Sequence, residues 1–238
     1  MINRITQIFI SDGGSLGPEL EKRANTFRHH FPRCEHVIFN YDMVRDFVAS
    51  HYHPNILKAL EKVKPYSYKC DLARFCIVNI LGGWYFDIGL TCNASVSVGE
   101  DVSLVAFRDI QRNTSTTWAC WTALFYARPR HEALEKAIEI ASNNILNEYY
   151  GESSLCPTGP IVWGRAVASL GMRQGFVFGD HMHLTPGMHE NNSAAVLPDG
   201  TILAFGKKSA AGNLSNLGAA GTNNYVQMWA QRDVYNPG

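Results

Sequence analysis

Four side chains in the first half of the chain could together bind an anionic ligand. Asp71 and Arg74 are three residues apart on a predicted helix over residues 67–81, so both side chains emerge on one face. A double glycine ends that helix, and alternation along the next predicted strand places Tyr85 and Asp87 on its polar side. A nucleotide sugar requires such a set: a carboxylate for hydroxyl groups, a cation for phosphate, an aromatic ring, and a carboxylate for a divalent cation.

Two segments, in this order, resemble the DXD-containing core of glycosyltransferase family 32: Cys70-Asp71-x-x-Arg74 and Gly82-Gly83-Trp84-Tyr85-Phe86-Asp87. The family pattern is Ser-Asp-x-x-Arg followed by Gly-Gly-x-Tyr-x-Asp-x-Asp. The opening run Ile5-Thr6-Gln7-Ile8-Phe9-Ile10 also resembles the first strand of the family, Ile-His-Gln-Ile-Trp-Ile. The likeness covers residues 1 to about 92. The family includes yeast initiating α-1,6-mannosyltransferases, bacterial capsule and lipopolysaccharide transferases, and the large clostridial glucosylating toxins.

The resemblance implies a role for each matched residue. Phe9 replaces a tryptophan that stacks on the nucleotide base, and Tyr85 is expected near the ribose. Asp71 and Arg74 would bind the donor sugar and its diphosphate, and they form the catalytic set with Asp87. The full set of expected donor-binding residues is Ile8, Phe9, Asp71, Arg74, Gly83, Tyr85, Asp87 and Trp229.

The metal motif departs from the family pattern. Asp87 is its first acid, but Gly89 stands where the family has the second. A hard divalent cation also takes oxygens from phosphates and water, so one carboxylate fewer weakens the site without abolishing it. The resemblance implies Mn²⁺ or Mg²⁺ held by Asp87 and, from the segment before Trp229, by Asn223.

The implied reaction transfers a sugar from a UDP- or GDP-sugar to a glycan or lipid-linked glycan, with retention of configuration. Cations at the phosphates stabilise the charge that develops on the leaving diphosphate. By analogy with the family, the acceptor attacks from the face of the leaving group, and the diphosphate oxygen helps to remove its proton. No residue of the chain is predicted as a dedicated base. By analogy we expect a cytoplasmic enzyme of bacterial surface polysaccharide synthesis. Such an enzyme could also associate peripherally with the membrane. The alternative is a non-catalytic module that binds nucleotide or glycan, because Gly89 has removed the metal.

The composition of the chain argues against several classes of protein. The 238 residues carry 21 Lys+Arg against 21 Asp+Glu, and this balance argues against nucleic acid as a partner. No run approaches the roughly 20 apolar residues of a membrane span, and residues 1–10 lack signal-peptide features, so we expect an intracellular chain. The six cysteines fall singly, which disfavours a disulfide scaffold or zinc module.

The elements that must position these residues alternate between strand and helix. Residues 5–10 and 36–40 are predicted strands around a helix that begins at Pro18. Further helices are predicted at 42–50, capped by Asp42, at 54–63, from Pro129, and at 160–170. Further strands are predicted at 84–88, 102–107, 176–178, 194–197 and 201–205, and residues 207–222 form a long loop.

This order predicts an α/β fold: a GT-A-like single domain in which helices flank a Rossmann-like mixed sheet. Residues 1–110 would form the donor half, and residues 111–238 the acceptor half with a closing C-terminal segment. Because ligands collect at the carboxyl ends of parallel strands, we expect the site near residues 9–14.

Three other patterns have a structural and a functional interpretation. His181, His183 and His189 could bind a metal, but histidines that are hydrogen-bonded or solvent-facing are the preferred interpretation. Trp118 and Trp121 could stack on an acceptor sugar, although core packing is the commoner fate of such a pair. The glycines of residues 13–17 resemble a dinucleotide loop only loosely, so a dehydrogenase is a distant alternative.

Overall fold

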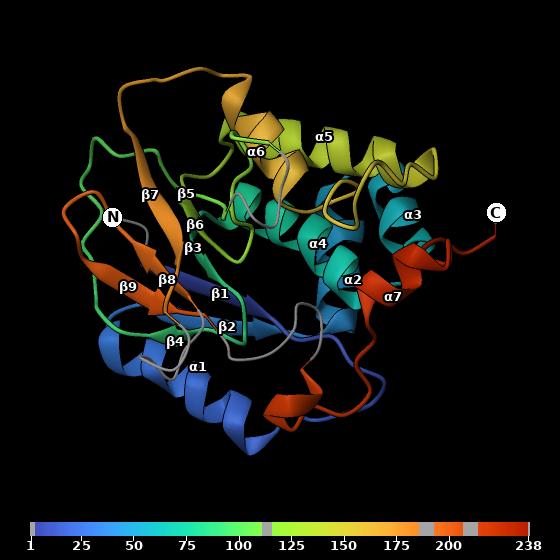
Figure 1. Ribbon diagram of the computed structural model, residues 1–238, viewed down its shortest axis with the longest axis horizontal. Coiled ribbons are helices and arrows are strands. Elements are labelled where there is room, and N and C mark those ends of the chain that lie inside the picture. The colour runs from blue at the N-terminus through green and yellow to red at the C-terminus, as the bar shows by residue number, and fades with distance from the viewer. Residues whose placement is uncertain (1–2, 111–115, 186–192, 207–213, 238) are drawn as a thin grey trace.

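The computed structural model describes residues 3–110, 116–185, 193–206 and 214–237 (Figure 1). In these ranges nine strands form one mixed sheet in the order β2-β1-β3-β6-β5-β7-β8-β9-β4. The strands are β1 (Arg4–Ile8), β2 (Glu35–Phe39), β3 (Gly83–Phe86), β4 (Thr91–Cys92), β5 (Leu104–Arg108), β6 (Leu124–Ala127), β7 (Phe176–His183), β8 (Ser193–Val196) and β9 (Ile202–Phe205). The helices are α1 (Pro18–His30), α2 (Tyr41–His51), α3 (Pro54–Lys62), α4 (Tyr66–Leu81), α5 (Glu132–Leu146), α6 (Pro160–Ala168) and α7 (Tyr225–Ala230), with a 3₁₀ turn at Ser215–Leu217. The predicted α/β class with a mixed sheet is confirmed.

The first part of the chain forms the predicted parallel unit. β1 pairs in parallel with β2 over its whole length and with β3 on its other side. α1 crosses between β1 and β2, and Pro18 occupies its first turn, where the absent N–H costs nothing. The carboxyl ends of β1 and β3 therefore lie side by side, which is where the sequence places the ligand.

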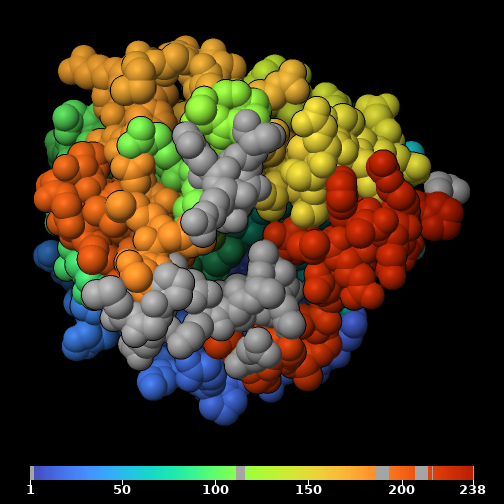
Figure 2. Space-filling view, viewed as in Figure 1, coloured from blue at the N-terminus to red at the C-terminus, as the bar shows by residue number. Residues whose placement is uncertain are grey.

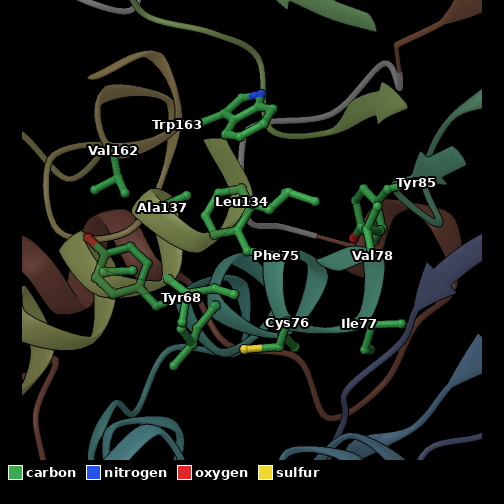
Figure 3. Packing of buried hydrophobic residues seen from close by; sticks show 14 of the residues in the cluster. Tyr68, Phe75, Cys76, Ile77, Val78, Tyr85, Leu134, Ala137, Val162 and Trp163 are labelled. Carbon is green, nitrogen blue, oxygen red and sulfur yellow. The ribbon is translucent and has the colours of Figure 1, made fainter. Parts of the chain in front are cut away.

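α4 is the central helix of the molecule. Most of its residues are buried, and polar side chains such as Asp71 and Arg74 are enclosed with the apolar ones. It ends at Gly82, which adopts φ 66° and donates its N–H to the Val78 carbonyl oxygen. Figure 3 shows how Phe75 of this helix packs toward α5 and α6, with its ring centroid 5.4 Å from that of Trp163.

Helices cover both faces of the sheet. On one face α1 packs through Phe27, whose ring centroid lies 4.4 Å from that of Phe86. On the other face lie α2 to α6 (Figure 1). The two faces of β3 are therefore both buried: Trp84 and Phe86 face the α1 side, and Tyr85 faces the α4 side.

Several elements differ from the sequence predictions. Strands β4 and β6 and helix α7 are not predicted, because they are short and carry weak periodicity. Asn40, not Asp42, caps α2 by accepting the N–H of Met43. α5 begins at Glu132 rather than at Pro129, since Arg130 adopts φ 55° and interrupts the helix.

Two further expectations concern the second half. β7 runs to His183 and is longer than the predicted 176–178. Of the predicted loop at 207–222, residues 207–213 lie outside the described residues, and the rest includes the 3₁₀ turn. Within the described ranges no helix is both long enough and apolar enough to cross a bilayer.

Candidate functional site

A cavity of about 510 Å³ opens at the carboxyl ends of β1 and β3. Figure 2 shows a hollow between the orange segment that holds β7–β9 on one side and the red C-terminal segment on the other. Its walls include Ile8, Phe9, Asp71, Arg74 and Asp87 from the sequence-predicted set. The position confirms the expected edge of the sheet and brings residues from β1, α4 and the end of β3 to one volume.

Arg74 is the centre of the polar wall. Its side chain is 4% exposed and forms ion pairs with Asp71 (Nη2 to Oδ1, 3.2 Å) and Asp87 (Nη1 to Oδ1, 3.1 Å). The guanidinium also donates from Nη1 to the Thr122 carbonyl oxygen at 2.7 Å and from Nε to the Cys70 carbonyl oxygen at 3.0 Å. The two hydrogen bonds use two of its five N–H groups, and the two carboxylates balance its charge. Burial opposes the positive charge, but the negative charge of Asp87 and other nearby groups outweighs it and raises the pKa of Arg74.

Asp71 is a buried carboxylate held on both sides. Thr158 donates its hydroxyl to Oδ2 at 2.8 Å, while Arg74 pairs with Oδ1. Burial raises the pKa of Asp71 to about 6, although Arg74 and Thr158 pull in the opposite direction. Asp71 lies on the wall of the cavity, and its pKa is shifted by its surroundings. It is therefore a candidate for binding a hydroxyl group of a ligand.

Tyr85 orients Asp87. The Tyr85 hydroxyl donates to Asp87 Oδ1 at 2.7 Å, and its ring lies beneath Arg74, with the guanidinium carbon 4.6 Å from the ring centroid. Burial raises the pKa of Tyr85 well above its ordinary value, so the phenol remains a hydrogen-bond donor. Tyr85 is fully buried and is not among the lining residues of the cavity, so its predicted contact with a ribose stays a prediction.

The backbone of Asp87 is fixed as well. Its N–H donates to the Ala123 carbonyl oxygen at 2.7 Å, and its carbonyl oxygen accepts the Gln7 side-chain amide at 3.4 Å. Gln7 is itself held by His36, whose Nε2 lies 2.7 Å from Gln7 Oε1. Burial lowers the pKa of His36 to about 4, so this ring is neutral and donates Nε2–H.

The structure therefore brings Asp71, Arg74, Tyr85 and Asp87 into one group joined by two ion pairs and a hydrogen bond, as the sequence predicts. Ile8 and Phe9 line the same cavity, but both are largely covered. Phe9 packs in a small apolar cluster with Leu20 and Leu217, and base stacking on its ring stays a prediction.

Three predicted residues have structural roles that the sequence does not reveal. Gly83 is not among the lining residues; it adopts φ 96°, and a Cβ there would lie 2.6 Å from the Arg4 carbonyl oxygen. Trp229 is also outside the lining and donates its indole N–H to the Tyr150 carbonyl oxygen at 2.9 Å. Asn223 lines the cavity, where its amide oxygen caps α4 by accepting the Tyr66 N–H at 2.9 Å.

A divalent cation finds few protein ligands here. Within the described residues no group of three His, Cys, Asp or Glu side chains could hold a metal. Asp87 Oδ1 accepts the Tyr85 hydroxyl and is ion-paired with Arg74. Among the described residues no hydrogen bond to Asp87 Oδ2 is found. The described donor set therefore fits a cation that takes most of its oxygens from the ligand and water.

Sequence reasoning missed a second polar group on the opposite wall. Asp109, His181 and Ser193 are hydrogen-bonded to one another, and Trp121 stacks on His181. His181 thus follows the preferred, hydrogen-bonded interpretation; His189 lies outside the described residues. His181 and His183 are two residues apart on a strand, which predicted that they share one face of the sheet. No local signal pointed to Asp109, which lies 72 residues from His181 in the sequence.

Comparison with known proteins shows what the first part of the chain is similar to. Residues 17–106 match the family model described as "Glycosyltransferase sugar-binding region containing DXD motif". The chain is 26% identical over 134 residues to a protein of Acanthamoeba polyphaga mimivirus named "Uncharacterized glycosyltransferase L373". This match covers 56% of the chain and 52% of the viral protein, so the chain spans about half the length of that relative.

The fold has a counterpart among solved structures. A structure titled "PaToxG Glycosyltransferase" aligns with a TM-score of 0.52 and 13% identity, covering 71% of this chain and 69% of that chain. At this identity the match shows likeness of fold. The matched residues 17–106 also hold the four side chains assembled at the cavity. This segment is therefore similar to the glycosyltransferase sugar-binding region containing a DXD motif.

Proposed function

We propose that the chain is a glycosyltransferase that binds a nucleotide diphosphate sugar in the cavity and transfers its sugar. The observation that carries this proposal is Arg74, fixed between Asp71 and Asp87 on the wall of a cavity at the carboxyl ends of β1 and β3. The family match over residues 17–106 and the name of the viral relative support the same class of reaction.

The side chains suit the charges of this reaction. Breaking the bond between sugar and phosphate develops negative charge on the departing diphosphate, and a fixed cation stabilises it. Arg74 has N–H groups beyond the two that donate to the Cys70 and Thr122 carbonyl oxygens, and we assign one of them to a phosphate oxygen. Asp71, with one oxygen already held by Thr158, would accept a sugar hydroxyl.

Mn²⁺ or Mg²⁺ would be held by Asp87, with Asn223 as a second oxygen ligand. When bound, the cation neutralises charge on the diphosphate. The support is Asp87 Oδ2, which is left without a partner among the described residues while Tyr85 and Arg74 fix Oδ1. The oxygen of Asn223 already accepts the Tyr66 N–H and would use its second lone pair.

The acceptor is proposed as a glycan or lipid-linked glycan, and the donor as a UDP- or GDP-sugar transferred with retention. These assignments come from the family resemblance. A role in bacterial surface polysaccharide synthesis, a cytoplasmic location and peripheral membrane association stay predictions of the same resemblance.

Donor binding can be measured by a thermal shift screen of UDP-, GDP- and CMP-sugars with and without Mn²⁺. A donor at about 100 times its Kd stabilises the folded state by about 2.7 kcal/mol, which raises the Tm by about 5–10 °C in a chain of this size. Donor hydrolysis or transfer is then assayed for each hit. Binding without turnover would favour a non-catalytic binding module, and no stabilisation by any sugar nucleotide would refute the proposal.

The metal assignment has its own variant. Asp87→Asn keeps the size of the side chain but removes the charge that holds a hard cation, so Mn²⁺-dependent donor affinity should be lost in calorimetry. Asp180→Asn is the matched control, because Asp180 is ion-paired with Arg108 away from the cavity lining. Equal Mn²⁺ dependence in Asp87→Asn and wild type would contradict the role of Asp87.

A further inference from the structure

The second polar group of the cavity is a chain of three hydrogen-bonded side chains from three segments. Asp109 follows β5, His181 lies on β7, and Ser193 begins β8. His181 Nδ1 lies 2.9 Å from Asp109 Oδ1, and His181 Nε2 lies 2.8 Å from Ser193 Oγ. All three residues line the same cavity as Asp71 and Asp87.

The chemistry of the three side chains determines which atom donates in each hydrogen bond. A carboxylate of Asp109 can only accept, so Nδ1 of His181 carries the proton. In the neutral ring Nε2 is then an acceptor, and the hydroxyl of Ser193 must donate to it. Ser193 Oγ keeps its lone pairs for a further donor, which orients it to accept a proton from a ligand hydroxyl.

Trp121 holds the ring of His181 in place. The two rings are stacked with centroids 3.7 Å apart and planes 6° apart. Stacking fixes the plane of the imidazole, and the indole face also stabilises an imidazolium ion if one forms. His181 can therefore gain a proton with Asp109 on one side and an electron-rich ring on its face.

A short stretch of backbone links the group of Asp109, His181 and Ser193 to the wall of the cavity that carries Arg74 and Asp87, here called the donor wall. The Thr122 carbonyl oxygen accepts Arg74 Nη1, and the Ala123 carbonyl oxygen accepts the Asp87 N–H. Trp121 directly precedes Thr122, and consecutive Cα atoms are only about 3.8 Å apart. The proton-accepting group and the donor-binding group thus border one reaction space.

We propose that Ser193, His181 and Asp109 form a relay that removes the proton from the hydroxyl group that attacks the sugar; this rests on the proposed function. The attacking oxygen bonds to the anomeric carbon as the bond between that carbon and the diphosphate oxygen breaks, and the diphosphate leaves with the electron pair. The proton of the attacking hydroxyl passes to Ser193 Oγ, and the proton of Ser193 passes to His181 Nε2. Asp109 is a positioning residue that fixes the tautomer and offsets the new charge.

The titration of His181 fits this role. Burial lowers the pKa of His181, Asp109 raises it, and His183, two residues along β7, lowers it. The groups packed against the ring from β8 and from the segment before β6, Ser193 and Trp121, are uncharged. The free ring is therefore neutral at pH 7 and able to accept a proton.

The relay can be tested by turnover and by donor affinity in the full chain. Ser193→Ala should lower kcat about 100-fold while the Kd of the donor stays at the wild-type value. Asp109→Asn should do the same, because the amide donates to Nδ1 and turns Nε2 into a donor. Its acid-side pH profile should also change, which a merely structural role would not cause. Ser142→Ala is the control, since Ser142 is equally buried but bonds only within α5.

A second readout needs no donor. Phenylmethylsulfonyl fluoride should sulfonylate Ser193, with fluoride leaving and the serine proton passing to His181. Asp109→Asn should reduce the labelling, measured by peptide mass spectrometry, at least 10-fold. Wild-type kcat in Ser193→Ala overturns the relay even when the donor binds. If no donor binds, the proposed function fails and the sugar-transfer role of the relay fails with it. Labelling then tests the proton transfer alone: a Ser193 adduct that depends on Asp109 supports transfer from Ser193 to His181, and no adduct overturns it.

Discussion

Replacing Asp71 by asparagine should change how stability depends on pH. Asp71 is buried, and its pKa in the folded state is about 6, above the ordinary value of 3.8. The folded state therefore holds this proton more tightly than the unfolded state does. As pH rises from about 4 to about 6 the unfolded chain releases the proton first, so the carboxyl group progressively destabilises the fold, and the loss is complete above pH 6.

The size of the effect follows from the two pKa values. Their difference is about 2 pH units, and each unit corresponds to 1.36 kcal/mol, so Asp71 costs about 3 kcal/mol at pH 7 relative to its protonated form. The asparagine side chain of the variant cannot titrate. The free energy of unfolding of Asp71→Asn minus that of wild type should therefore increase by about 3 kcal/mol between pH 3.5 and pH 7.

Urea unfolding of both proteins at half-unit pH intervals measures this difference, and the contributions of all other titrating groups cancel in it. Thr158→Val provides a second test. It removes the hydroxyl that donates to Asp71, so the pKa of Asp71 should rise further and the window of pH dependence should extend upward. A difference between Asp71→Asn and wild type that stays constant from pH 3.5 to pH 7 would refute the reasoning.

Two other predictions separate positioning residues from ligand-binding ones. Tyr85→Phe removes the hydroxyl that donates to Asp87; because Asp87 is partly exposed and water can replace the bond, we expect a loss of about 1 kcal/mol and a Tm lower by about 2–4 °C, with weaker Mn²⁺-dependent donor binding in calorimetry. An unchanged donor Kd would show that Asp87 needs no such support. Gly83→Ala should destabilise the fold by more than about 2 kcal/mol in urea, since the new Cβ meets the Arg4 carbonyl oxygen at a positive φ. Gly171→Ala has a similar φ with open space around it and should lose about 1 kcal/mol; equal losses in the two variants would contradict the steric argument.

Local patterns in the sequence were sufficient to predict α4 and β3, the two elements that position the side chains of the donor wall. The spacing of Asp71 and Arg74 places both on one helical face, and the double glycine turns the chain back into β3. These signals are local, because helix periodicity, glycine at a helix end and strand alternation depend on residues a few positions apart. The double-glycine turn and the strand alternation also predict that Tyr85 and Asp87 converge with this pair, and the contacts among the four side chains agree.

Patterns that are short or weak did not predict structure. β6 inserts antiparallel between β3 and β5 and supplies no clear periodicity in its four residues. Its position decides where the carbonyl groups of Thr122 and Ala123 lie, and those carbonyls hold Arg74 and the Asp87 backbone.

What the sequence determined by itself is the set of ionisable groups on α4 and after β3 and the edge of the sheet at which they meet. Tertiary structure alone decided their partners: Thr158 reaches Asp71 across 87 residues, and His181 reaches Asp109 across 72. The same long-range packing commits Asn223 to capping α4 and Tyr85 to the interior. Such pairs depend on the order of strands in the sheet, because a hydrogen bond forms only where the fold brings donor and acceptor within about 3 Å.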